Sequence, residues 1–294
     1  MVAIDSKSLE ISVKPGLGQH GYFVIFPIFE RCREAIQPET RLPMEKLSAY
    51  VLTRNSEKYL SQVLTSMDRM ADEIVVLDSG SSDRTEEITQ QFAKARFIFS
   101  EFRNFRDQRI CAANHCTHDM ILFLDSDEIP DKLFEDSVLA LKNEGFVCDV
   151  YTITRRWKVL GREVCAVYPV SAPDDPIRIY NKTKASFEAS PELHEAPRGY
   201  KSVGRIGGTV MHITFETLDE IARKTQFYSD IAANDLVQQK RNISLFASLF
   251  VPMALFIKWY ILRKGYKDGR VGFRLARFAY DIARNKYAKA RKMA

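Results

Sequence analysis

The sequence predicts an α/β protein with a Rossmann-like, mostly parallel sheet flanked by helices and a C-terminal amphipathic helical extension. Short apolar runs alternate with helically spaced segments between residues 46 and 125, the pattern of βαβ units. Polar clusters follow three of these runs, and residues 258–294 hold twelve Lys and Arg against two acids. With 46% hydrophobic and 28% charged residues, the 294-residue chain is not disordered, collagen-like or a multi-pass membrane protein.

The parallel half of the sheet is expected between residues 46 and 125. Its first helix places Leu60, Val63 and Met67 on one face. The run Glu73–Asp78 is apolar enough for a strand covered on both sides. In chain order the expected elements are strand 46–53, helix 56–70, strand 73–78, a helix capped by Ser82 or Asp83, strand 96–100, helix 107–116 and strand 120–125.

The rest of the chain is less regular. Strand-like pieces are expected at 150–154, 176–180 and 208–213, followed by a helix at 217–239 and an apolar segment at 244–262 that Pro252 interrupts. The apolar run within residues 1–43 is too short to span a bilayer. We expect an atypical N-terminal extension there, a start-site artefact if translation naturally begins at Met44. Five Cys without a CxxC pair indicate buried thiols in a reducing compartment.

Three polar clusters follow three expected strands, where ligands bind in open α/β sheets. They are Thr53-Arg54-Asn55, Asp78-Ser79-Gly80-Ser81-Ser82-Asp83 and Asp125-Ser126-Asp127-Glu128. Each cluster alone is also what turns and helix caps use. Three clusters at one edge of a sheet favour a binding site.

Asp125 and Asp127 are the most specific pair, because side chains at i and i+2 of a strand point to one side. Two such carboxylates repel each other unless a cation lies between them. Hard oxygen ligands suit Mg²⁺ or Mn²⁺, and such an ion neutralises a departing diphosphate. The alternative is that Asp127 and Glu128 cap a helix beginning near Asp131.

Taken together, these motifs resemble the family 2 glycosyltransferases of GT-A fold. More narrowly they resemble bacterial lipopolysaccharide inner-core β-1,4-glucosyltransferases, over about residues 46–280. The matching segments are Tyr50–Asn55, Ile74–Thr85, Gln108-Arg109, Leu122–Glu128, Pro176–Tyr180, Leu193-His194-Glu195, His212 with Lys224 and Tyr228, and Gly265–Gly269.

The resemblance implies a site for a UDP-sugar donor. Its nucleotide-sugar residues would be Thr53, Arg54, Asn55, Asp78, Ser79, Gly80, Arg109 and Asp125. Asp127 would hold Mg²⁺ or Mn²⁺ through the diphosphate, and Glu195 would be the general base. Family members invert the anomeric centre by a single displacement, which needs one base and a positioned acceptor but no covalent nucleophile.

The roles of two predicted site residues, Glu195 and His212, each have an alternative. Glu195 lies in a Pro-flanked loop and is otherwise an exposed carboxylate, with Asp174 and Asp175 as rival bases. His212 is a further candidate metal ligand or a hydrogen-bonded structural residue. Ile110 follows Gln108-Arg109 where relatives commonly have Asn, and residues 159–171 have no clear counterpart, which leaves the acceptor open.

The basic tail suggests an anionic membrane surface as a partner. Phe273, Ala276, Tyr280, Ala283 and Tyr287 form a helical stripe flanked by arginines, and residues 244–262 would dip into the interface beside it. The alternative is that both helices pack on the main domain. The acidic remainder of the chain argues against nucleic acid. The expected domains are the 1–43 extension, a 44–240 GT-A catalytic domain and a 241–294 membrane-associating tail.

The sequence therefore predicts an inverting, metal-dependent glycosyltransferase on the cytoplasmic face of a bacterial inner membrane. It would move a sugar, most simply glucose, from a UDP-sugar to a lipid-linked saccharide acceptor, lipopolysaccharide core above all. Rival functions are a non-catalytic saccharide-binding or scaffold protein, a nucleotidyltransferase, and transfer to a polyprenyl phosphate. Residues 53–57 lack the Gly-rich, basic phosphate loop of a nucleotidyltransferase, and spanning helices typical of the last rival are absent from the sequence.

Overall fold

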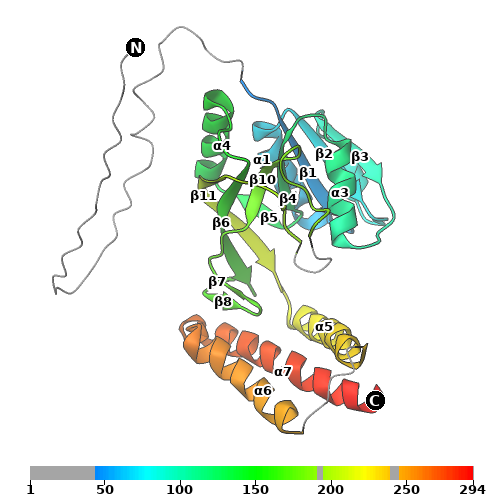
Figure 1. Cartoon of the computed structure of the whole chain (residues 1–294), viewed down its shortest axis with the longest axis vertical. Coiled ribbons are helices and arrows are strands. Elements are labelled where there is room, and N and C mark those ends of the chain that lie inside the picture. Colours follow the sequence, from blue (N-terminus) through cyan, green and yellow to red (C-terminus); the bar gives the residue numbers. More distant parts are fainter. Residues whose placement is uncertain (1–43, 191–194, 239–244, 294) are drawn as a thin grey trace, which may run out of the picture. The chain divides into compact units, whose positions relative to one another are not determined.

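A computed structural model describes residues 44–190, 195–238 and 245–293. The expected start at Met44 and the nature of residues 1–43 lie outside the described residues. A mixed sheet in the order β3-β2-β1-β4-β10-β6-β11-β5 forms the centre, with β7 paired to β6 (Figure 1). The parallel strands at one side are β1 (Leu47–Thr53), β2 (Glu73–Asp78), β3 (Ala95–Phe99) and β4 (Met120–Asp125).

The parallel strands are covered on both faces, which explains their continuous apolar runs. Ala49 and Val51 join one buried cluster with α1, whereas Tyr50 joins a second cluster with α3. The connecting helices are α1 (Glu57–Met70), α2 (Thr85–Thr89) and α3 (Phe105–His115). This half of the α/β prediction is confirmed, with boundaries within two residues for the strands and for α1 and α3.

The other half of the sheet is mixed, and two of its strands, β6 and β11, are longer than expected. It contains β5 (Glu128–Pro130), β6 (Val150–Val159), β10 (Ile177–Asn181) and β11 (Val203–Thr214), with α4 (Lys132–Glu144) packed beside β11. β10 runs antiparallel to β4 and β6, whereas β11 runs parallel to β6. The short strands β7 (Arg162–Val164), β8 (Ala166–Val167) and β9 (Val170–Ser171) follow β6.

The chain closes with three long helices that lie side by side (Figure 1). They are α5 (Leu218–Gln238), α6 (Leu245–Ile257) and α7 (Gly269–Met293), with a π-helical turn η3 (Lys258–Leu262) and a 3₁₀ turn η4 (Gly265–Asp268) between α6 and α7. Leu275 and Phe278 of α7 pack with Val159, Val164 and Phe215. The described residues all belong to one compact unit.

The apolar stripe predicted on α7 is largely inside the protein. Ala276 and Ala283 are buried and Tyr280 is partly buried, whereas Phe273 is 48% exposed. The stripe therefore serves mainly as packing surface. Among the described helices, no single one is long and apolar enough to cross a bilayer. One bent pair, Phe246–Leu262 with Gly265–Met293 at 72°, reaches that length and composition together.

Candidate functional site

The three polar clusters meet at the carboxyl edge of the parallel strands, because β1 lies between β2 and β4. The backbone N–H of Asn55 donates to Ser81 Oγ at 2.7 Å, and Asn55 Oδ1 accepts from the Ser82 N–H at 2.8 Å. Ser56 Oγ donates to Ser126 Oγ at 3.0 Å, which links the first cluster to the third. Asn55 adopts a positive φ of 52°, a conformation that Asn tolerates well.

Asp78 organises the loop after β2. Its Oδ1 accepts from Thr53 Oγ1 at 2.8 Å and from Ser81 Oγ at 2.5 Å, and its Oδ2 accepts from the N–H groups of Gly80 and Ser81. Ser79 N–H donates to the Thr53 carbonyl at 3.0 Å, and Gly80 takes a φ of +92° that favours glycine. Both Asp78 oxygens thus hold the loop in shape, so its direct role toward a nucleotide stays a prediction.

Arg109 joins two predicted site residues. Its Nη2 donates to Asp125 Oδ1 at 2.8 Å and its Nε donates to Glu195 Oε1 at 3.0 Å. The guanidinium is buried over the ring of Phe123, at 4.9 Å from the centroid. Burial opposes its charge, but Asp125 and Glu195 outweigh that effect and raise the pKa of Arg109. The structure therefore brings Arg109, Asp125 and Glu195 together.

A second buried ion cluster surrounds Glu128 of the third polar cluster, and its arginine partners were not predicted as site residues. Glu128 accepts hydrogen bonds from Arg178 Nε at 2.7 Å and from Arg155 Nη1 at 2.8 Å. Arg178 also donates to Asp125 Oδ2 at 3.1 Å. Burial raises the pKa of each carboxyl, but the arginines hold the pKa of both Asp125 and Glu128 below its usual range. An arginine inside the apolar strand Ile177–Asn181 was the available signal.

The helix-capping alternative for Asp127 and Glu128 is wrong. Asp131 caps α4 instead, because its Oδ1 accepts from the Phe134 N–H at 2.8 Å. Glu128 lies in β5, fully buried among arginines.

Asp127 and His212 face each other at the edge of this cluster. His212 Nδ1 lies 3.6 Å from Asp127 Oδ1 and 3.5 Å from Glu128 Oε1, because His212 is the strand partner of Glu128. Burial raises the pKa of Asp127 to about 6, and the nearby acids add to that. Burial lowers the pKa of His212, but Glu128 and Asp127 more than offset this and the net shift is upward. Trp157 packs on the imidazole, with 4.4 Å between ring centroids.

A divalent cation fits the Asp127 and His212 pair. Nδ1 of His212 is buried without a hydrogen-bond partner, and a carboxylate with a raised pKa faces it. Asp125, Glu128 and His212 also present ligand atoms within 4.8 Å of one another. The carboxylates of Asp125 and Glu128 are already bonded to arginines, so a cation there would meet guanidinium charge. We therefore favour Asp127 with His212.

A cavity of about 230 Å³ opens beside Asp127. Its walls come from the segments that follow β1 and β4, from the end of β11 and from the starts of α1 and α5. The lining residues are Arg54, Asn55, Ser56, Lys58, Tyr59, Ser126, Asp127, Ile213, Thr214, Phe215, Glu216, Glu220 and Lys224. Lys58 and Tyr59 both donate to Glu216 and so fasten the start of α5 to α1. The exposed Arg54 and the Lys224 ammonium give this cavity the cations that a diphosphate needs.

The rival bases bond to other arginines than Glu195 does. Asp174 accepts hydrogen bonds from the Trp157 indole N–H at 2.7 Å and from Arg155, which also bonds Glu128, so Asp174 belongs to the Glu128 cluster. Asp175 pairs with Arg205 on an exposed surface. Glu195 is the one of the three that contacts the Asp125 cluster through Arg109, although it does not line the cavity.

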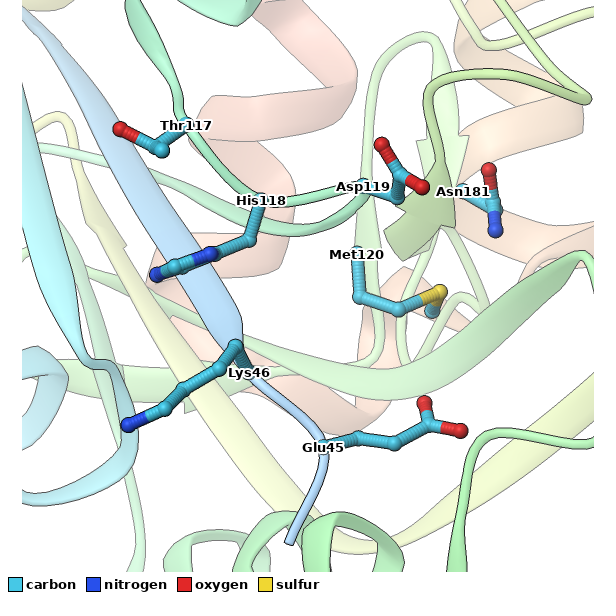
Figure 2. Close-up of a pocket in the computed structure, with 7 residues that line it drawn as sticks. All are labelled: Glu45, Lys46, Thr117, His118, Asp119, Met120 and Asn181. Carbon is cyan, nitrogen blue, oxygen red and sulfur yellow. The ribbon is translucent and has the colours of Figure 1, made fainter. Parts of the chain in front are cut away.

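A larger cavity of about 460 Å³ lies at the opposite edge of the sheet, where β1 and β4 begin (Figure 2). It is lined by Glu45, Lys46, Thr117, His118, Asp119, Met120 and Asn181. Lys46 is paired with Asp72 at 2.9 Å, and no predicted site residue reaches this cavity. The smaller cavity, at the carboxyl edge, is therefore the candidate site.

Part of the chain matches a known protein family. The profile of the family described as Glycosyl transferase family 2 matches residues 48–163. The chain carries a family 2 glycosyltransferase domain. The matched range includes the clusters around Asn55, Asp78 and Asp127 and ends before Arg178, Glu195 and His212.

Two glycosyltransferases resemble the chain beyond this domain. The lipopolysaccharide core biosynthesis glycosyltransferase LpsC of Rhizobium meliloti is 26% identical over 248 residues, which cover 79% of this chain and 87% of that protein. An uncharacterized glycosyltransferase of Rickettsia typhi is 27% identical over 242 residues, with 78% and 81% covered. The chain is thus a glycosyltransferase, similar over most of its length to a lipopolysaccharide core enzyme.

Two solved structures align with the chain at TM-scores below 0.5. S. aureus TarS 1–349 with UDP aligns at a TM-score of 0.44 and 18% identity, covering 85% of this chain and 92% of that one. Glucosyl-3-phosphoglycerate synthase of Mycobacterium tuberculosis, solved with Mn²⁺, UDP and glucosyl-3-phosphoglycerate, aligns at 0.33 and 24% identity, covering 38% and 44%. The α/β sheet and C-terminal helices of the glycosyltransferase agree with the predicted GT-A fold class.

Proposed function

We propose that the glycosyltransferase moves a hexosyl group from a UDP-sugar to a hydroxyl of a lipid-linked saccharide, with lipopolysaccharide core as the acceptor class. The facing pair of Asp127 and His212 carries this proposal, because Asp127 lines the 230 Å³ cavity. The resemblance of the chain to LpsC supports the acceptor class. We further propose a peripheral location on the cytoplasmic face of the inner membrane.

Asp127 and His212 would hold Mg²⁺ or Mn²⁺ at the diphosphate end of the donor. Such an ion supplies charge neutralisation to the departing UDP. Asn55 and Arg54 would contact the nucleotide from β1, while Lys224 offers a second cation from α5. Arg109 and Arg178 neutralise Asp125, which leaves it as a hydrogen-bond acceptor beside the sugar rather than an uncompensated charge.

Glu195 would remove the proton of the acceptor hydroxyl. The hydroxyl oxygen forms a bond to the anomeric carbon, the bond from that carbon to the diphosphate breaks, and UDP leaves with the electron pair. Because attack and departure lie on opposite sides of the carbon, an α-linked donor gives a β-glycoside. Arg109 fixes the Glu195 carboxylate through one nitrogen and Asp125 through another, which sets the base relative to the donor site.

The test is UDP release from a panel of UDP-sugars with a heptose-bearing core lipid, with and without Mg²⁺ or Mn²⁺. We expect metal-dependent release from one donor, and Asp127→Asn should lower it by about a hundredfold or more. Glu195→Gln should lower kcat by about 10²–10⁴-fold while UDP-sugar binding persists. Asp119→Asn, an exposed carboxylate at the other end of β4, is the matched control and should behave like the parent.

Two results would count against the proposal. No release with any donor, together with no metal-dependent binding of UDP, would favour a non-catalytic saccharide-binding protein. Release that is unchanged in Asp127→Asn would mean that the metal pair has been placed wrongly.

A further inference from the structure

The segment formed by α6 and η3 has two apolar faces. One face packs on α7, because Leu255, Phe256 and Trp259 contact the cluster that contains Ala276 and Ala279. The opposite face points to solvent and is 42–70% exposed, and we call it the outer face. Its residues are Phe246, Leu249, Phe250, Met253, Ile257, Ile261 and Leu262.

The outer face is one continuous helical stripe. Its members recur at the three- and four-residue spacing that places side chains on one side of a helix. Phe246 and Phe250 stack on each other at one end of the stripe, with 4.0 Å between ring centroids. A helix that is apolar all round belongs where both faces meet apolar surroundings. Only one of the two faces of α6 is covered by the described residues.

Six cations follow this face in the chain, from η3 to the first turns of α7, and we call them the bordering cations. Lys258, Arg263, Lys264, Lys267, Arg270 and Arg274 are all exposed. None of the six makes an ion pair with another described residue, and residues 245–267 contain no Asp or Glu. Tyr266, half exposed, adds an aromatic ring with a polar tip at the same border. Apolar side chains beside lysine, arginine and tyrosine form the composition of interfacial helices.

We propose that the outer face of α6 and η3 lies in the headgroup boundary of an anionic lipid bilayer, with the bordering cations on the lipid phosphates. The proposal rests on the membrane location put forward above and assigns it to α6 rather than to the stripe on α7. We call Val159, Val164 and Phe215, which α7 covers, the strand patch. If the bent pair crossed the bilayer, Leu275, Phe278 and Ile282 of α7 would lose their contacts with this patch. The helix pair therefore lies on the membrane without spanning it.

A second copy of the chain fits this face less well than lipid. A twofold contact through the outer face would bring the six cations of each copy together, against a single acid between Lys258 and Arg274, Asp268, whose carboxylate accepts from the Cys165 N–H. Anionic headgroups would attract these cations instead, because each Lys or Arg near a negatively charged lipid surface strengthens binding. This attraction acts over about one Debye length and is weakened by salt.

The placement also connects the membrane to the candidate site. α5 lines the donor cavity with Glu220 and Lys224 and packs along α7, where Ser229 Oγ donates to the Ile282 carbonyl and Lys289 pairs with Asp230. α7 carries α6 on another face. A saccharide anchored in the same leaflet would thus have two helix layers between its lipid and the donor cavity.

Vesicle flotation of the full chain tests the proposal. We expect binding to phosphatidylglycerol-containing vesicles, weaker binding to pure phosphatidylcholine, and loss of the difference at high salt. Leu249→Ser with Phe250→Ser should lower binding by at least about tenfold, because two apolar side chains leave the interface. Arg263→Ser with Lys264→Ser should weaken binding to anionic vesicles and reduce its salt dependence. Leu133→Ser, which removes a 62% exposed leucine of α4, is the control and should bind as the parent.

Each variant is also compared with the parent in vesicle-free buffer. Sedimentation gives the oligomeric state, and UDP binding, UDP release and thermal melting show whether the fold and the donor site are intact. Parent-like UDP binding and melting in the Leu249/Phe250 variant, with lost flotation, would support the proposal. Unchanged flotation of the Leu249/Phe250 variant would overturn the proposal. So would a parent protein that does not bind vesicles but forms a dimer, if the same variant is a monomer. If the parent protein binds vesicles but releases no UDP from any donor, the result would count against the transfer reaction alone.

Discussion

Arg109 shows how one side chain can set the geometry of two others. Its guanidinium is buried and bonds Asp125 and Glu195 at once. Replacement by Met leaves two carboxylates near one another without their shared cation. We expect Arg109→Met to lower the free energy of unfolding by about 3–5 kcal/mol, the cost of breaking a buried ion pair on one side. Urea unfolding followed by circular dichroism measures it.

Arg103→Met is the matched control, because Arg103 is exposed in the loop before α3. Its unfolding free energy should change by less than about 0.5 kcal/mol. Equal losses in the two variants would mean that Arg109 contributes only as a surface arginine does.

At the scale of elements, β11 approaches α4 so closely that one position admits only glycine. A Cβ on Gly208 would lie 2.2 Å from the Phe134 nitrogen and 2.6 Å from Asp131 Oδ1, and its φ is +80°. Gly208→Ala should therefore push β11 from the N-terminus of α4 and cost more than about 2 kcal/mol of unfolding free energy. Thermal melting compares it with Gly269→Ala, where φ is +59° and no atom lies within 4 Å. The control should lose only about 1 kcal/mol.

Asp72 links three elements and makes stability depend on pH. It accepts from Lys46 at 2.9 Å, from the Leu47 N–H at 2.9 Å and from the buried Lys142 at 2.8 Å. Burial alone would raise the pKa of Asp72, but Lys142 and the other donors hold it below its usual range. A depressed folded pKa stabilises the protein above the unfolded pKa of about 3.9, and this stabilisation is lost as the pH falls through the folded value.

Asp72→Asn should accordingly lose about 1–3 kcal/mol of unfolding free energy at pH 7. The gap between variant and parent should narrow below about pH 4, where the unfolded aspartate protonates. Urea titrations at a series of pH values measure both curves. A gap that is constant down to the acid limit would show that the carboxylate charge of Asp72 does not stabilise the fold.

Across the whole molecule, the predictable part is the part built from local βαβ units. Strands such as Glu73–Asp78 and Met120–Asp125 are apolar on both faces and end in polar clusters. The apolar runs therefore predict where these strands begin and end, and their shared direction predicts that the clusters meet at one edge of the sheet. The strand Val203–Thr214 pairs with Val150–Val159 across a long stretch of chain, and no local signal gives its length. Its expected core, 208–213, covers only half of it.

The candidate site divides in the same way. Asp125 and Asp127 are visible as a motif, but the partners that neutralise Asp125 come from α3 and β10, and only the fold brings Arg109 and Arg178 to it. The amphipathic stripe of α7 illustrates the opposite limit. Periodicity marks one apolar face, but it does not say whether protein or lipid covers that face. Here α6 and η3 pack on Phe273 and Ala276, whereas the α7 residues that pack on the strands, Leu275, Phe278 and Ile282, lie outside the predicted stripe.

Val159, Val164 and Phe215 are covered by α7, which is synthesised after them. These residues leave the ribosome well before residues 269–293 do, so the strand patch stays bare for roughly several seconds at ordinary elongation rates. The nascent chain is therefore expected to engage a holdase chaperone in that interval. Stalled nascent chains that end before residue 269 should crosslink to such a chaperone, and chains that include an emerged α7 should not.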